Sequence, residues 1–357
     1  MATNISKGTK TRVIDVHGHL MGLWTPEIDE KYKKHMPYLA KDAAGHEVLM
    51  IRGEPRYSIP HPELMFDPKV IIRELDRTGV DIMALSIMPL FNYDLPLDLG
   101  IATSRMQNEA IANAVKAYPD RFVGLATVPL QDPQEAAKEL ERAMKELSMK
   151  GVEIATEVDG KNLDWRELWP FYEKAQELGA FILVHPGHPP GADRMKKYGL
   201  WNLVGFPAAT SLAIGNIIFG GVLEDFPRLK LCFVHGGGFT PYQIGRLDCG
   251  FRVRPDCSQI IKRNPSEYFK YLYFDTITHY RPALEFLIAT VGSDRVVVGT
   301  DAPFDVADPD PVGTVNQLQS ITAAEKERIL GITAARILGI EPARKEKYRK
   351  TNYGLRE

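Results

Sequence analysis

Apolar residues fall along this chain in short unbroken runs, and amphipathic stretches separate one run from the next. Unbroken apolar runs are typical of strands buried on both faces, as in parallel sheets whose connections are helices. Eight such runs, rich in β-branched and aromatic residues, lie at 12–16, 81–88, 122–128, 152–157, 181–185, 229–235, 272–275 and 296–299. The pattern predicts eight β-strands that alternate with helices.

Eight strand–helix units in succession indicate an α/β chain folded as a (β/α)8 barrel of the TIM type. An open doubly wound sheet is the alternative, but no G-x-G-x-x-G sequence follows any predicted strand. We expect one barrel domain over residues 1–357. The segment 21–67, rich in proline, glycine and charge, is longer than an ordinary strand-to-helix loop, so we expect an inserted lid or small subdomain there.

Two histidines separated by one glycine, His17 and His19, follow the first apolar run. In extended chain, residues i and i+2 point to the same side, so both imidazoles can reach one point. Imidazole is the commonest metal ligand among side chains. Taken alone, the pair is a weak signal, because a buried or surface histidine without a metal is common.

Three further strand runs end in residues that bind metals or move protons: His185, His235 and Asp301. Active sites of (β/α)8 barrels lie at the carboxyl ends of the strands. Each histidine alone could be a structural residue at the barrel rim, but the set together indicates a site. Three histidines and a carboxylate (His17, His19, His185 and Asp301) would hold one divalent metal and leave a coordination position open.

His235 is better suited to acid–base chemistry than to metal binding, since imidazole titrates near neutral pH and can pass a proton to substrate or take one from a metal-bound water. The three glycines after it would let the backbone approach a bound molecule. The fourth strand offers no lysine that could bridge two metals. Glu153 and Glu157 could do so, but we expect them to be solvated or ion-paired, which favours a single metal.

Arginines indicate an acidic substrate, because a guanidinium binds a carboxylate with two parallel bonds. Arg246, Arg252 and Arg254 follow the His235 loop, and Arg52 lies in the long first loop. Ordinary surface ion pairs are the alternative for each one. The sequence therefore suggests a small-molecule carboxylate as the substrate.

The overall composition excludes several other classes of protein. Apolar residues make up 44% of the 357 residues and charged residues 25%, with a formal net charge of −2, so no basic field recruits nucleic acid or a membrane surface. We expect no apolar run long enough to span a bilayer and no secretion signal. Three cysteines, an odd and sparse set, favour reduced thiols in the cytoplasm.

Several stretches resemble the amidohydrolase superfamily and, within it, the branch of metal-dependent decarboxylases. The resemblance rests on the strand-end residues above and on runs such as 121–129, 194–198, 203–210, 219–227, 232–238 and 250–256. That family leads us to expect an aromatic residue after His185 and another after Asp301. The chain has Pro186 and Ala302 instead, which puts differences in the wall of the pocket.

The resemblance implies roles for individual residues. His17, His19, His185 and Asp301 would hold the metal, zinc by expectation and manganese as the alternative, and His235 would be the acid–base residue. Arg246 matches an arginine that reaches the active site of the neighbouring subunit, which implies a homodimer. Arg52 and Arg254 would bind substrate.

The implied reaction is loss of CO₂ without oxygen or a redox cofactor. The substrate would be a carboxylated aromatic-degradation intermediate, either a carboxymuconate semialdehyde or a hydroxylated aromatic acid. A metal-dependent hydrolase or hydratase acting on a lactone, an amide or an unsaturated acid is the alternative, because the same ligands serve both. A non-catalytic binding protein is a third hypothesis, disfavoured because an open metal site beside a base has no evident use in binding alone.

Overall fold

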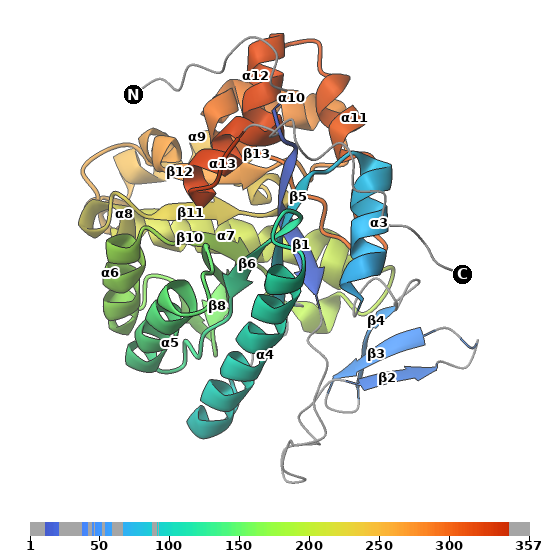
Figure 1. The fold of residues 1–357 in the computed structure, drawn as a ribbon. Coiled ribbons are helices and arrows are strands. Elements are labelled where there is room, and N and C mark those ends of the chain that lie inside the picture. Colours follow the sequence, from blue (N-terminus) through green and yellow to red (C-terminus); the bar gives the residue numbers. More distant parts are fainter. Residues whose placement is uncertain are drawn as a thin grey trace, which may run out of the picture.

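One eight-stranded sheet forms the centre of the molecule (Figure 1). The computed structural model describes residues 11–20, 38–41, 45, 47–51, 54–58, 67–87, 91 and 93–342. The strands are all parallel to their neighbours and follow the order of the chain. They are β1 (Ile14–Leu20), β5 (Ile82–Ile87), β6 (Phe122–Ala126), β7 (Gly151–Ala155), β10 (Phe181–His185), β11 (Lys230–Phe233), β12 (Leu272–Asp275) and β13 (Val296–Val297).

Backbone hydrogen bonds join the first strand to the last part of the sheet. The Val16 N–H donates to the Val298 carbonyl at 2.9 Å, and the His19 N–H donates to the Ala302 carbonyl at 2.8 Å. Parallel bridges at the same place close the sheet on itself, which leaves no open edge. The predicted barrel is therefore confirmed, and the open doubly wound sheet is rejected.

Helices surround the barrel on its outer side (Figure 1). Asp67 and Asp132 each accept hydrogen bonds from backbone N–H groups of the turn that follows and precede a proline, so two helices begin there. The helices are α3 (Pro68–Thr78), α4 (Leu97–Ala117), α5 (Pro133–Lys145), α6 (Trp169–Leu178), α7 (Phe206–Phe219), α8 (Val222–Asp225), α9 (Thr240–Val253), α10 (Arg281–Val291), α11 (Pro311–Asn316), α12 (Ala323–Glu327) and α13 (Thr333–Leu338). The sequence pattern did not predict the short helix α11.

A β-bulge in β1 sets the direction of the two histidines. Between Asp15 and Gly18 the strand has one residue more than the facing part of β5. Ile14 and Val16 belong to an apolar cluster inside the sheet, and the extra residue reverses the alternation beyond them. His17 and His19 also lie within the strand rather than after its end, because pairing with β5 continues to Leu20.

One helix corrects an expectation about membrane spans. The turn η3 (Trp201–Gly205) runs on into α7, and Trp201–Phe219 is a 19-residue helix with a mean hydropathy of 1.4, long and apolar enough by composition to cross a bilayer. The sequence analysis expected no run of that length. In the fold, 44% of the helix is buried, and its apolar face packs into the main hydrophobic core through Ala213, Ile214 and Ile217.

Part of the expected insertion is visible as a separate small sheet. The strands β2 (Tyr38–Lys41), β3 (Glu47–Ile51) and β4 (Glu54–Ser58) pair antiparallel in that order. Much of the segment 21–67 lies outside the described residues, so its role as a lid stays a prediction. A two-stranded hairpin, β8 (Glu157–Val158) with β9 (Lys161–Asn162), follows the fourth barrel strand.

Candidate metal centre

Four side chains from three places in the barrel converge at its carboxyl end. His17 and His19 lie on β1, His185 is the last residue of β10, and Asp301 follows β13. Their ligand atoms all lie within 4.8 Å of one another, and all four residues are buried. The structure thus brings together the four residues that the sequence singled out as candidate ligands.

Asp301 lies at the centre of the group. Its Oδ1 is 3.3 Å from His17 Nε2, 3.2 Å from His19 Nε2 and 3.8 Å from His185 Nε2. His17 Nε2 and His185 Nε2 are buried and have no hydrogen-bond partner among the described residues. Buried polar atoms without a partner are costly, so two of them aimed at a carboxylate fit a cation between them. The cluster therefore fits a divalent metal.

The other nitrogen of each imidazole is held from behind. His17 Nδ1 is 2.9 Å from Asp275 Oδ2, His19 Nδ1 is 2.8 Å from the Ile87 carbonyl, and His185 Nδ1 is 2.8 Å from the Pro186 carbonyl. An Nδ1–H that donates to such an oxygen leaves the lone pair on Nε2, which is the atom that faces the centre. Asp275, which the sequence left open between a supporting and a structural role, therefore orients His17.

The electrostatics of the cluster favour a cation. Burial opposes a charge on Asp301, yet the imidazoles, His17 above all, lower its pKa well below the usual range. Burial alone lowers the pKa of His17, but the carboxylates of Asp301 and Asp275 raise it to about 10. Burial lowers the pKa of His185 well below its usual range, so this ring stays neutral. A metal entering the centre would displace a proton from His17, so its binding is coupled to proton release.

His235 stands beside the cluster with a different set of contacts. Its Nε2 is 3.2 Å from Asp301 Oδ2, and the ring of Phe206 stacks nearly parallel on it at 6.3 Å between centroids. Its backbone has φ +54°, an uncommon value for a residue other than glycine and one found at functional sites. The residue is thus close enough to Asp301 to face a molecule bound at the metal.

The glycines after His235 serve the fold rather than a bound molecule. A Cβ on Gly238 would lie 2.2 Å from the Pro207 carbonyl oxygen, and a Cβ on Gly237 would lie 2.6 Å from the ring of Phe274. Both residues also have positive φ, which favours glycine. The expectation that the backbone here approaches a ligand is replaced by a close approach to α7 and β12.

Glu153 corrects a further expectation. It is completely buried, with Oε1 3.8 Å from His19 Nδ1, so it is not solvated. Burial raises its pKa to about 7, against the nearby imidazoles of His19 and His17. Glu157 instead lies in the hairpin at the surface, where its Oε1 is 3.8 Å from Nδ1 of the exposed His188.

Aromatic residues border the cluster at positions that the sequence did not indicate. The ring of Phe304 lies 5.3 Å from that of His19, and the ring of Phe206 lies 5.9 Å from that of His185. These two residues stand where the aromatics expected directly after Asp301 and His185 are missing. The offset was not visible in the sequence, because each aromatic comes from a different turn of the chain.

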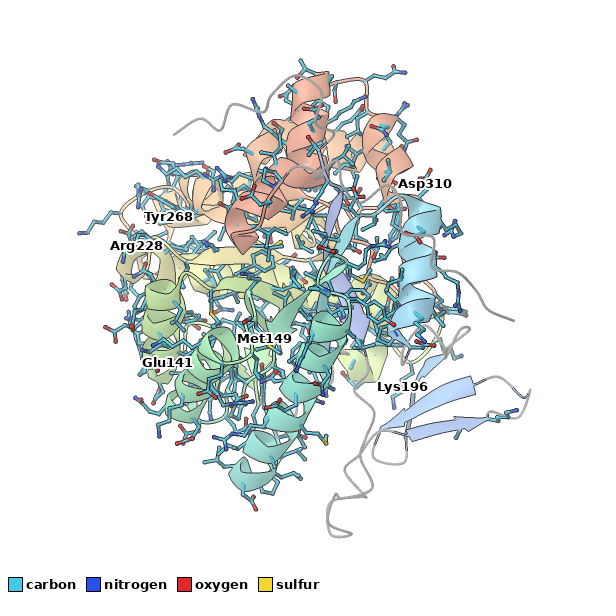
Figure 2. All side chains as sticks on the ribbon, viewed as in Figure 1. Glu141, Met149, Lys196, Arg228, Tyr268 and Asp310 are labelled. Atoms are coloured by element: carbon cyan, nitrogen blue, oxygen red, sulfur yellow. The ribbon has the colours of Figure 1, made fainter. Side chains whose placement is uncertain are left out.

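The candidate substrate arginines do not join the cluster within one chain. Arg246 lies on α9 and Arg254 follows its end, and both are exposed. Arg52 lies outside the described residues. The segment between β10 and α7 covers the same end of the barrel, and Figure 2 shows its Lys196 on the side towards which β1 points.

Comparisons with known proteins agree with this geometry. A family model described as amidohydrolase matches residues 14–340. A 2-amino-3-carboxymuconate-6-semialdehyde decarboxylase from Dictyostelium discoideum is 37% identical over 339 residues, which cover 92% of each chain. A γ-resorcylate decarboxylase from Polaromonas sp. is 29% identical over 72% of this chain and 83% of its own length. The crystal structure of 5-carboxyvanillate decarboxylase from Sphingomonas paucimobilis superposes with a TM-score of 0.79 at 25% identity, covering 93% of this chain and all of that one.

Proposed function

The chain belongs to the amidohydrolase family, in its branch of metal-dependent decarboxylases, and on that premise we propose that it removes CO₂ from a carboxylated aromatic-degradation intermediate. One observation carries the proposal: a buried cluster of three imidazoles and a carboxylate with a further imidazole, His235, against the same carboxylate. No oxygen or redox cofactor takes part, because breaking the C–C bond leaves the electron pair on carbon and needs only a proton.

The roles of the residues follow from their positions. His17, His19, His185 and Asp301 hold the metal, which supplies a Lewis acid that polarises the substrate. His235 directs Nε2 at the centre, 3.2 Å from Asp301 Oδ2, and gives its proton to the carbon that loses CO₂. Phe206 and Phe304 enclose the reacting end of the substrate in apolar surface. The proton returns to His235 from solvent.

We propose zinc as the resident metal. A set of three imidazoles and one carboxylate suits zinc, and manganese is the alternative because it also accepts nitrogen and oxygen ligands. Metal analysis of protein purified without added metal distinguishes the two. Zinc in place of manganese, at about one ion per chain, is the expected result.

Two kinds of substrate fit the proposal. The first is 2-amino-3-carboxymuconate semialdehyde, the substrate named for the Dictyostelium relative, and the second is a hydroxylated aromatic acid such as those named for the other two proteins. We propose the first, because that relative shares 37% of its residues with this chain. Arg52 and Arg254 would bind the carboxylates of the substrate.

Loss of the semialdehyde with release of one CO₂ per molecule is the expected result when metal-loaded protein is mixed with fresh substrate. Absorbance of the substrate and evolved CO₂ are followed together, against a blank without protein. CO₂ from hydroxybenzoates but not from the semialdehyde would reassign the substrate. Consumption of a lactone or an unsaturated acid without CO₂ would favour the hydrolase or hydratase alternative.

We propose that a second copy of the chain completes the site. The neighbouring helices α9 and α10 (Figure 1) expose an aromatic surface that consists of Phe239, Tyr242 and Phe286. Tyr242 is 77% exposed, and its ring lies 6.0 Å from that of Phe286. Exposed aromatic groups of this kind are typical of interfaces. Arg246 lies one helical turn after Tyr242, so a partner seated on the aromatic surface would receive it.

Mixing two inactive variants tests whether Arg246 acts across the interface. In a mixed dimer of H235A and R246A subunits, one site keeps both its own His235 and the partner's Arg246. Statistical mixing makes half of the dimers mixed, so roughly a quarter of the wild-type CO₂ release should return. Arg246 that served its own subunit would give no recovery, and R252A in place of R246A is the matched control.

Two further proposals concern the whole chain. The segment 21–67 would act as a lid or small subdomain of a single barrel domain, in keeping with the long connection after β1. A cytoplasmic location is consistent with the three cysteines, Cys232, Cys249 and Cys257, which are free thiols.

A further inference from the structure

One buried carboxylate in the described residues has no hydrogen bond. Five carboxylates are buried there: those of Asp15, Glu139, Glu153, Asp275 and Asp301. Four of them accept hydrogen bonds from side chains or backbone N–H groups. Both oxygens of Glu153 are buried and lack any such partner. A buried carboxylate without hydrogen bonds is strongly disfavoured unless a cation lies near it.

The surroundings of Glu153 offer only one source of positive charge. The residue lies on β7, in register with Leu183 of β10, and its side chain is fully enclosed. Its closest charged neighbour is His19, whose Nδ1 is 3.8 Å from Glu153 Oε1. No lysine or arginine forms an ion pair with it in the part of the chain that the structure describes. The compensating charge therefore has to come from the metal centre.

We propose that Glu153 is an outer-sphere anion of the metal centre, which stabilises the bound cation from behind His19. This rests on the proposed metal site, not on the identity of the substrate. His19 lies between the two charges, with Nε2 towards Asp301 and Nδ1 towards both the Ile87 carbonyl and Glu153. A negative charge on that side makes the imidazole a stronger donor to the metal. Glu153 is thus a positioning and charge-balancing residue, not a catalytic one.

The proposal makes two effects move in opposite directions. Replacing Glu153 by glutamine keeps the shape of the side chain and removes the charge. The metal then loses a nearby anion, so its affinity falls about tenfold to a hundredfold, the usual range for outer-sphere partners. The metal-free protein loses a buried uncompensated charge, so its melting temperature rises. A residue that served packing alone would change neither in this pattern.

The experiment uses protein stripped of metal with a chelator and then titrated with zinc against a chromophoric competitor. E153Q and E153M, a second variant of similar length without charge, are each expected to bind zinc more weakly and to melt higher than wild type when metal-free. E157Q is the matched control, because its carboxylate comes from the same stretch of chain but lies in the surface hairpin, and it should leave both values unchanged.

Two outcomes would overturn the proposal. Wild-type zinc affinity in E153Q and E153M would mean that Glu153 carries no charge felt by the metal. A lower melting temperature of the metal-free variants would mean that the side chain stabilises the fold by itself. Neither readout uses CO₂ release, so a wrong substrate leaves this test intact. Wild-type protein that binds no zinc would overturn both this inference and the metal centre.

Discussion

Protein that carries Asp301→Ala is expected to retain no metal and to release CO₂ no faster than the blank. Asp301 is the one carboxylate among the four candidate ligands, and its Oδ1 lies 3.2 to 3.8 Å from three imidazole Nε2 atoms. Without it, the buried imidazoles have no anion to offset a bound cation. Metal content per chain, measured after gel filtration, should fall from one ion to none, and activity should disappear with it.

Asp305→Asn is the matched control for this substitution. Asp305 is exposed and lies four residues further along the same loop, so the amide should leave metal content and activity near wild type. A D301A protein that keeps its metal would show that the imidazoles alone form the site. Full activity without metal would reject the proposed function altogether.

His235→Ala is expected to keep the metal and to lower the rate of CO₂ release by about 10² to 10⁴, the range for a positioned acid–base group. Its Nε2 lies 3.2 Å from Asp301 Oδ2, yet the three imidazoles and Asp301 are complete without it. Metal content, substrate binding and kcat should therefore separate, with only kcat strongly reduced. Stopped-flow absorbance with parallel CO₂ detection measures the rate.

His188→Ala serves as the control, because His188 follows the same end of the barrel but is exposed and faces Glu157 instead of Asp301. We expect its kcat to stay near that of wild type. If H235A loses its metal, His235 is a fifth ligand instead of an acid–base residue. If H235A keeps full activity, another group delivers the proton and the assignment of His235 is wrong.

The sequence by itself determined the barrel. Each barrel strand coincides with a predicted apolar run, because burial on both faces requires apolar residues at consecutive positions and leaves a local signal. The candidate ligands were also local signals, since His185 and Asp301 come directly at or after strand ends where a barrel places its site.

Only the tertiary structure decided which side chains meet. The bulge in β1 that turns His17 and His19 inward depends on pairing with β5, and closure of the barrel through the Ala302 carbonyl sets Asp301 against them. Asp275 and Glu153 gain their roles because strands distant in sequence bring them behind two different imidazoles. Such contacts leave no periodic trace, because each joins residues with more than a hundred others between them. A pattern along the chain reports burial and strand ends, whereas the pairing of strands fixes the distances on which the chemistry depends.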